Sequence, residues 1–139
     1  MWDVEGDRYI DFQSGQRCVA LGHSPPDYVE ALTGQARKIM QTGTSFITAS
    51  EVLLAEKIAE VAPDPLQQSF FACTGAESNE MALRLVRKVT GRFEGIALQW
   101  GYHGQTYGSA SITGRGGQLR EGYGPMPTGV AFIPTPYTY

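Results

Sequence analysis

The sequence predicts an α/β protein built around a parallel sheet. A short apolar run at residues 69–73 leads through a glycine turn into an amphipathic helix, and a second apolar run follows that helix at residues 95–99. A third run of the same kind, at residues 130–133, is a candidate strand of the same sheet. Because a strand–helix–strand succession of this length is a βαβ unit, we expect its two strands to be parallel and its crossover right-handed.

The N-terminal segment has the pattern of a β-hairpin. Residues 3–13 contain the turn sequence Glu5-Gly6-Asp7, and strand-forming side chains follow it at Tyr9, Ile10 and Phe12. Residues 14–16 then break the pattern, because a glycine lies there between two polar residues. We therefore expect a short two-stranded start to the chain.

Two helices are predicted next. The first begins at Ser24, which forms a capping box with Asp27, has prolines at its early positions, and ends at a glycine, Gly43. The second runs from about residue 50 to residue 62, preceded by the capping pair Thr48 and Glu51 and followed by prolines.

The third predicted helix follows the 69–73 run and ends at about Thr90. Its apolar residues occur at i, i+3, i+4 and i+7, the spacing of a buried stripe: Ala82, Leu85, Val86 and Val89. Basic residues lie away from this stripe near the C-terminal end, where they suit the helix dipole: Arg84, Arg87 and Lys88.

Composition excludes several classes of protein. The 139 residues are long enough for one domain with a core, and 42% apolar with 18% charged residues is an ordinary globular balance. A net charge of −3 argues against a nucleic-acid partner, and no apolar stretch approaches the roughly 20 residues that span a bilayer. Since no secretory signal is present, we expect a cytosolic (cytoplasmic) protein with Cys18 and Cys73 as free thiols.

The last third of the chain is irregular. Residues 114–139 are rich in glycine and proline and contain no strong helix. Because long irregular segments normally lead into another element, we expect the chain to be truncated at its C-terminus. An open sheet without its later strands exposes an edge and a face, so the isolated chain is expected to be poorly folded or to self-associate.

The turn after the 69–73 run is the first candidate site. Thr74-Gly75-Ala76 opens the third helix, where free backbone N–H groups and the helix dipole favour an anion, and small residues let a phosphate approach. Thr74 and Glu77 also form a capping box, so the same residues are compatible with a well-capped helix that binds nothing. Capping alone favours that second interpretation, and the choice stays open.

The loop after the 95–99 run is the second. Tyr102 and His103 lie between Gly101 and Gly104, beyond a strand expected next to the phosphate turn. Ligands of open α/β sheets bind outside the carboxyl ends of the strands, where an aromatic ring can stack on a flat ligand. A phosphate seat beside an aromatic side chain predicts a planar, phosphorylated cofactor.

Several stretches together resemble a known family, the class III aminotransferases. The matching residues are Asp7–Phe12, Ser14-Gly15, Leu21–His23 with Pro26, Thr74–Glu80 and Tyr102–Thr106. Within that class, three further stretches are most similar to the 2,2-dialkylglycine decarboxylase branch: Ser14-Gly15-Gln16, Thr90-Gly91-Arg92 and Ile133–Tyr137. The resemblance covers nearly the whole chain. It implies a cofactor, pyridoxal 5'-phosphate, and the fold called type I.

The resemblance also implies a domain arrangement. Residues 1–45 would form the N-terminal small-domain segment with an interface helix, and residues 46–139 the first part of the cofactor-binding large domain, truncated at the C-terminus. The implied fold is a partial fold-type-I transferase, a three-layer α/β/α structure of which the chain holds the first half of the large-domain sheet.

Roles carried over from the family place the cofactor between the two candidate sites. Gly75 and Ala76 would donate backbone N–H groups to the cofactor phosphate, assisted by the hydroxyl of Thr74. Tyr102 would stack on the pyridine ring, and His103 would flank that platform.

Two carried-over assignments have alternatives. The decarboxylase branch carries tryptophan at the position of Tyr102, and Trp100 lies two residues earlier, so which aromatic covers the ring stays open. Gln16 would match the glutamine that contacts the substrate carboxylate in the decarboxylase, or would be an ordinary polar loop residue. Gln16 is the main residue that favours decarboxylation coupled to transamination.

No catalytic residue is assigned. The family's Schiff-base lysine and the acid beside the pyridine nitrogen both lie beyond the part that this chain matches. The lysines present, Lys38, Lys57 and Lys88, occupy predicted polar helix faces, whereas a nucleophilic lysine needs a desolvated or cation-flanked pocket. We therefore expect the fragment to be inactive alone.

The resemblance implies amino acid and keto acid substrates and a homodimer, in which the segment near Thr44-Ser45-Phe46 faces the other subunit. One alternative is an ω-amino-acid or 4-aminobutyrate-type aminotransferase without decarboxylation. Another is a non-catalytic partner subunit that supplies part of a shared site. A generic nucleotide-binding domain is disfavoured, because residues 74–76 form no GxGxxG turn and no P-loop lysine follows.

Overall fold

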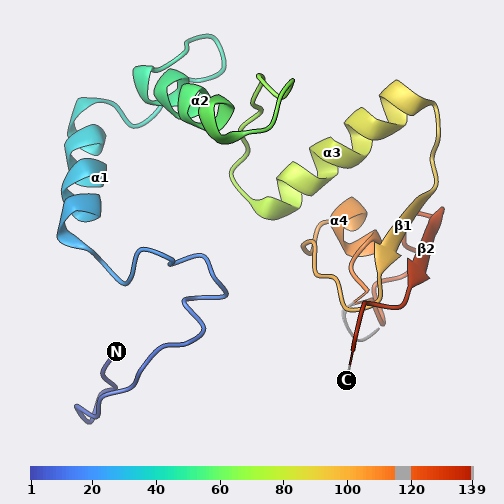
Figure 1. Ribbon diagram of the computed structural model, residues 1–139, viewed down its shortest axis with the longest axis horizontal. Helices are drawn as coiled ribbons and strands as arrows, with labels where there is room; N and C mark the ends of the chain where they lie inside the picture. The colour runs from blue at the N-terminus through green and yellow to red at the C-terminus, as the bar shows by residue number, and fades with distance from the viewer. Residues whose placement is uncertain (115–119, 139) are drawn as a thin grey trace. The chain divides into compact units, whose positions relative to one another are not determined.

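The computed structural model of the 139-residue chain describes residues 1–114 and 120–138 (Figure 1). The chain divides into two compact units, Met1–Asp64 and Pro65–Tyr139. The first unit contains helices α1 (Pro26–Lys38) and α2 (Ala49–Val61). The second contains helix α3 (Gly75–Thr90), strand β1 (Gly95–Leu98), the short helix α4 (Tyr107–Ser111) and strand β2 (Val130–Ile133).

The start of α1 differs from the prediction. Pro25 is the N-cap residue and makes no side-chain cap, so the expected capping box of Ser24 and Asp27 is wrong. Ser24 lies one position too early and has a left-handed backbone, with φ of 52°. The helix also ends before the predicted glycine, because the backbone is already extended at Ile39.

Helix α2 follows the prediction closely. Thr48 Oγ1 accepts a hydrogen bond of 3.3 Å from the N–H of Glu51, and the Glu51 carboxylate accepts one of 3.5 Å from the N–H of Thr48. This reciprocal capping box satisfies two of the donors that a helix start leaves free. The helix ends at Val61, before the prolines.

The predicted N-terminal hairpin is reduced to a turn and a single bridge. The bridge joins Trp2 and Arg8, and Asp3 Oδ1 accepts hydrogen bonds from the N–H groups of Glu5 and Asp7 inside the turn. No ladder continues beyond this bridge among the described residues, and Asp11 Oδ1 accepts hydrogen bonds from the N–H groups of Gln13 and Ser14 in the turn that follows.

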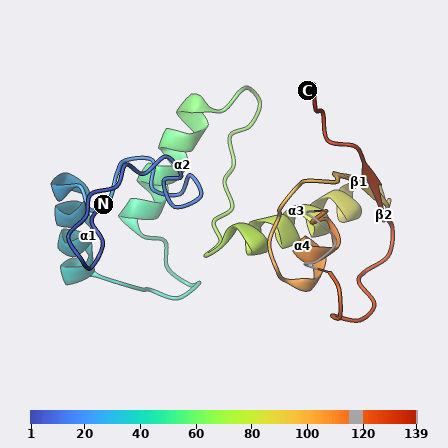
Figure 2. The same cartoon turned by 90° about the horizontal axis from the view of Figure 1, so that it is seen from below.

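The sheet of the second unit has two parallel strands (Figures 1 and 2). Gly95 of β1 pairs with Val130 of β2 and Leu98 pairs with Ile133, which confirms that the runs at 95–99 and 130–133 are strands of one sheet. The prediction of a strand at 69–73 is wrong for this structure. Among the described residues that run has no ladder partner, and an extended segment becomes a strand only by pairing with another. Consequently no βαβ unit forms around α3.

Helix α4 was not predicted from the sequence. Its five residues, Tyr107–Ser111, are small or polar except for one tyrosine, so they show no helical hydrophobic period. Ser109, Ala110 and Ser111 are nevertheless buried, together with Thr113. The interior of the second unit is therefore formed largely by hydroxyl-bearing side chains around α4.

Large apolar faces remain uncovered in the described part of the chain. On α3 the stripe expected to be buried is exposed, with Leu85 at 62%, Val86 at 57% and Val89 at 75%. Only Ala97 and Ala110 form a buried hydrophobic core there. The accessible surface is 12215 Å², whereas two separately compact halves of this mass would expose about 8,500 Å² in all. The expected uncovered faces are thus present.

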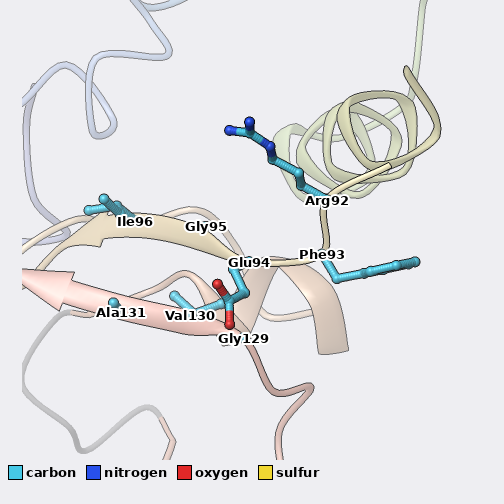
Figure 3. Close-up of a pocket in the computed structure, with 8 residues that line it drawn as sticks. All are labelled: Arg92, Phe93, Glu94, Gly95, Ile96, Gly129, Val130 and Ala131. Atoms are coloured by element: carbon cyan, nitrogen blue, oxygen red, sulfur yellow. The ribbon is translucent and has the colours of Figure 1, made fainter. Parts of the chain in front are cut away.

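A wide hollow of about 930 Å³ lies against the beginning of the two strands (Figure 3). Residues 92–96 line one side of it and residues 129–131 the other. Phe93 and Ile96 beside it are 71% and 72% exposed, and among the described residues the ionisable side chains that line it are those of Arg92 and Glu94. The hollow is an uncovered part of the sheet rather than a site with convergent polar groups.

Among the described residues, no helix is both long and apolar enough to cross a membrane.

Candidate functional site

The N-terminus of α3 is a capped turn that keeps two donors free. Thr74 Oγ1 accepts a hydrogen bond of 3.2 Å from the N–H of Glu77, and Glu77 Oε2 accepts bonds of 3.0 and 2.9 Å from the N–H groups of Thr74 and Cys73. The predicted capping box is confirmed. It leaves the N–H groups of Gly75 and Ala76 without a hydrogen-bond partner among the described residues. Two free donors at the positive end of a helix fit a phosphate.

The Tyr102–His103 loop is held by backbone and hydroxyl contacts. The N–H of Gly101 donates a hydrogen bond to the carbonyl oxygen of Leu98, and the N–H of Gly114 donates one to the carbonyl oxygen of Gly101. Both donor–acceptor distances are 3.0 Å. Thr113 Oγ1, fully buried, accepts a hydrogen bond of 3.0 Å from the N–H of His103. The loop therefore has a fixed backbone course at the end of β1.

This loop lies directly against the α3 turn. Gly104 has φ of 124°, and a Cβ atom added to it would lie 2.6 Å from Ala76 Cβ and 2.9 Å from Ala76 Cα. Only glycine fits there, for conformational and steric reasons together. The two candidate sites that the sequence placed separately are thus in contact in the folded chain.

Between them lies a cleft of about 450 Å³, within the usual size range of small-molecule sites. Its lining includes five of the six predicted site residues: Thr74, Gly75, Ala76, Tyr102 and His103. Asn79, Gly104 and Gln105 complete it. Tyr102 is 49% exposed, whereas Trp100 does not line the cleft and donates from its backbone N–H to Thr135 Oγ1.

Two polar residues of α3 tie this site together, and the sequence reasoning missed them. Asn79 Nδ2 donates a hydrogen bond of 2.8 Å to the carbonyl oxygen of His103. Glu80 Oε1 accepts bonds from Thr106 Oγ1 at 2.5 Å, the N–H of Gly108 at 2.7 Å and the N–H of Ser109 at 3.1 Å. The sequence did hold a signal for them, because Asn79 and Glu80 follow the turn motif inside the predicted helix, about one helical turn after the N-cap residue Thr74.

The Glu80 carboxylate is held in its ionised form. The hydrogen bond from Thr106, outweighing partial desolvation, lowers the pKa of Glu80 below its ordinary value of 4.5, and the two backbone donors and the positive charge of Arg87 act in the same direction. A carboxylate that accepts several hydrogen bonds titrates at lower pH because those bonds favour the charged form.

Gln16 belongs to the first unit and occupies an unusual backbone conformation. Residues 14–17 all have left-handed φ values, 50° at Ser14, 55° at Gly15, 61° at Gln16 and 71° at Arg17. A run of such residues is costly for side chains other than glycine, so something must hold it. Asp11 does so by accepting hydrogen bonds from the N–H groups of residues 13 and 14.

His23 contributes to the same arrangement. Its Nε2 lies 2.8 Å from Asp11 Oδ2, and this bond is the main cause of the lowered pKa of the Asp11 carboxyl. Gln16 itself is exposed. The predicted roles of Gln16 and of the five cleft residues remain predictions.

Among the described residues, no lysine lines the cleft. Lys88 is near the far end of α3, about 20 Å from Gly75 at 1.5 Å per helical residue. Lys57 belongs to the first unit and pairs with Glu60 Oε2 at 2.6 Å, and Lys38 is in the last turn of α1.

Comparison with known proteins identifies the family. The chain matches the family "Aminotransferase class-III" over residues 1–139. An uncharacterized aminotransferase of Schizosaccharomyces pombe is 35% identical, over 98% of this chain and 30% of that protein. The acetylornithine aminotransferase of Methanothermobacter thermautotrophicus is 34% identical, over 96% of this chain and 34% of that protein.

Solved structures show the same fold. An (S)-enantioselective ω-transaminase from Thermomicrobium roseum superposes with a TM-score of 0.89 and 34% identity, over 98% of this chain and 32% of that one. A taurine:2-oxoglutarate aminotransferase from Bifidobacterium kashiwanohense, solved with PLP and glutamate, has a TM-score of 0.88 and 33% identity, over 97% of this chain and 30% of that one.

The chain spans about a third of the length of these relatives. Its fold is accordingly a partial α/β transferase fold, as predicted. Enzymes of this family depend on pyridoxal phosphate. From the match over its whole length, the chain belongs to the class III aminotransferase family.

Proposed function

We propose that this chain is the N-terminal part of a pyridoxal-phosphate-dependent class III aminotransferase, and that the cleft between α3 and the Tyr102–His103 loop binds the cofactor. One observation carries the proposal. The two unpartnered N–H groups at the start of α3 line the same cleft as the half-exposed ring of Tyr102. Phosphate donors and an aromatic surface in one cleft of suitable size fit a small planar phosphate ester.

Each cleft residue has a distinct task. Gly75 and Ala76 donate N–H groups to the phosphate, whose negative charge is further stabilised by the α3 dipole. Tyr102 supports one face of the ring, and His103 borders it. When bound, the cofactor acts as an electron sink for the α-carbon of an amino acid, and the protein supplies binding and orientation.

The experiment compares pyridoxal phosphate with pyridoxal, which lacks the phosphate. We expect the native polypeptide, the form its source produces, to bind the phosphate ester at least about a hundredfold more tightly, as two charge-assisted hydrogen bonds predict. Equal affinities for the two compounds would exclude a phosphate seat at Gly75 and Ala76.

The reaction is proposed to be amino-group transfer between an amino acid and a keto acid. Gln16, presented by its left-handed turn, supports the finer assignment that decarboxylation is coupled to the transfer, as in 2,2-dialkylglycine decarboxylase. The second candidate is transfer without decarboxylation, favoured by relatives named acetylornithine aminotransferase and ω-transaminase. 2-Aminoisobutyrate separates the two, because it has no α-proton and reacts only by losing carbon dioxide.

We further propose that the lysine and the acid required by the reaction lie outside this chain. The intact mass of the native polypeptide tests this. A mass near three times the 15.1 kDa of this chain is expected from the coverage of its relatives. A mass of 15.1 kDa would instead favour the third candidate, a non-catalytic subunit that supplies part of a site to a partner.

Assembly and location follow from the same proposal. We infer a homodimer in the cytoplasm, with the segment around Thr44–Phe46 at the subunit interface, where the 70% exposure of Phe46 supports the assignment. Residues 1–45 would belong to the small-domain segment and residues 46–139 to the large domain. Sedimentation of the native polypeptide measures the assembly state.

A further inference from the structure

Helix α4 begins with a cap that is only partly local. Ser109 Oγ accepts a hydrogen bond of 3.1 Å from the N–H of Thr106, the N-cap residue, whereas the Thr106 hydroxyl donates to Glu80 Oε1. The N–H groups of Gly108 and Ser109, which a helix start leaves free, donate to the same oxygen. A carboxylate from α3 therefore performs the capping function for a different helix, 26 to 29 residues further along the chain.

The Glu80 carboxylate lies directly against the backbone of Gly108, where a Cβ atom added to this residue would collide with it. Helix α4 is in turn connected to the Tyr102–His103 loop. The buried Thr113 Oγ1 lies 2.9 Å from the carbonyl oxygen of Ser109 and accepts a bond from the N–H of His103.

A continuous set of hydrogen bonds thus leads from Glu80 through α4 and Thr113 to His103. Asn79, the preceding residue, bonds the carbonyl oxygen of His103 directly. The loop side of the cleft is therefore held by two consecutive residues of α3, Asn79 and Glu80. The first turn of the same helix forms the other side and carries the free N–H groups of Gly75 and Ala76.

We propose that Glu80 is a positioning residue, which sets the separation between the phosphate donors at the start of α3 and the ring-binding loop. This rests on the proposed function of the cleft. Glu80 does not line the cleft and need not touch the cofactor. Its effect is to hold the loop at the one spacing at which a ligand carrying both a phosphate and a ring meets both halves of the site.

Replacing Glu80 should weaken the binding of a ligand that contacts both the phosphate donors and the loop, but not the binding of a ligand that contacts only the donors. Pyridoxal phosphate requires the phosphate donors and the loop together, whereas inorganic phosphate requires only the donors. In Glu80→Ala of the native polypeptide we expect about a tenfold loss of pyridoxal phosphate affinity, and inorganic phosphate affinity within twofold of the unmodified protein.

Three companion variants separate positioning from folding. Glu80→Gln keeps an acceptor oxygen and should recover most of the affinity. Thr106→Val removes only the hydroxyl donor and should cause a smaller loss in the same direction. Glu56→Ala removes an exposed glutamate of α2 and should leave the affinities for pyridoxal phosphate and inorganic phosphate unchanged. Induced circular dichroism of the bound cofactor, which reports the orientation of its ring, should weaken most in Glu80→Ala and stay unchanged in Glu56→Ala.

Amide hydrogen exchange gives a readout that needs no cofactor. In Glu80→Ala, exchange at residues 103–113 should accelerate while exchange in α2 is unchanged. Equal losses for both ligands, or unchanged pyridoxal phosphate affinity, would overturn the positioning role. If the unmodified protein bound inorganic phosphate but not pyridoxal phosphate, the proposed function would be wrong. If exchange at residues 103–113 were unchanged in Glu80→Ala, the positioning role of Glu80 would be wrong whatever the function of the cleft.

Discussion

Asn79 donates a hydrogen bond from its side-chain amide to the carbonyl oxygen of His103, at 2.8 Å and 24 residues away in sequence. Its neighbour Glu80 accepts hydrogen bonds from the start of α4. A donor and an acceptor at consecutive positions of α3 therefore hold two parts of the following segment. This arrangement explains why a loop rich in glycine has a defined course beside the phosphate turn.

Replacing Asn79 by aspartate tests the tether. Asn79→Asp keeps the shape, removes the donor and places a negative oxygen against the carbonyl of His103. We expect a loss of about 2 kcal/mol in the stability of the second unit, measured by hydrogen exchange in the native polypeptide. The control is Gln41→Glu, which makes the same change in charge at an exposed position and should lower the stability by less than about 0.5 kcal/mol. Similar effects in both variants would show that the bond is not stabilising.

Replacing Gly75 by proline tests the phosphate donors. Gly75 is the first residue of α3, where proline is well tolerated, and Thr74 before it is already extended. Gly75→Pro therefore removes one N–H group and preserves the helix. Pyridoxal phosphate affinity, measured by equilibrium titration, should fall about 30-fold, the effect of a charge-assisted hydrogen bond near 2 kcal/mol.

Gly75→Ala is the matched control, because it keeps the N–H group and its added Cβ would meet no atom within 4 Å. Its affinity should stay within about threefold of the unmodified protein. A comparable loss in both variants would assign the effect to crowding instead of the donor.

Replacing Gly104 by alanine tests the contact between the loop and α3. The added Cβ would overlap Ala76 and the backbone would be strained, so we expect a loss of about 3 kcal/mol or more in unfolding free energy. Gly91→Ala also places alanine at positive φ but in open space, and should cost about 1 kcal/mol. Thermal unfolding of the two variants should therefore differ clearly, and equal losses would mean that the overlap is relieved.

The Glu80 contact should depend on pH in one direction. Because folding lowers the pKa of Glu80, its stabilising contribution is fully present above the unfolded value near 4.5 and is lost as the pH falls through the lower folded value. Exchange at residues 103–113 should accelerate over that acidic range. Glu80→Gln should not show this dependence, and an identical profile in the variant would assign the titration to another group.

The 139-residue chain expressed alone should self-associate. Apolar side chains on α2 and α3 are largely exposed, including Leu53 at 60% and Val89 at 75%. Exposed apolar area of this extent drives association. Sedimentation velocity should show oligomers whose size grows with concentration, while a monomer with a sharp thermal transition would contradict the expectation.

Sequence patterns predicted the elements whose signals are local. The capping boxes at Thr48 and Thr74 define the starts of α2 and α3, and the apolar runs at 95–99 and 130–133 form the parallel pair of strands. Capping depends on residues three apart, and the strand pattern on a few neighbours, so both can be recognised without knowledge of the fold.

Features that depend on partners distant in sequence could not be predicted. The run at 69–73 has the composition of a strand but no neighbour to pair with among the described residues. Helix α4 owes part of its capping to Glu80, and no local pattern predicts a hydrogen-bond acceptor that comes from another helix. The sequence pointed to the two loops that line the cleft, whereas the contacts of Asn79, Glu80 and Thr113, which support these loops, were not predicted.

The hydrogen bonds that assemble the cleft all lie within the stretch from Cys73 to Gly114. Closing loops of this length costs little chain entropy, since that cost rises only with the logarithm of loop length. The hydrogen bonds of the phosphate seat therefore need no partner from any later part of a longer polypeptide.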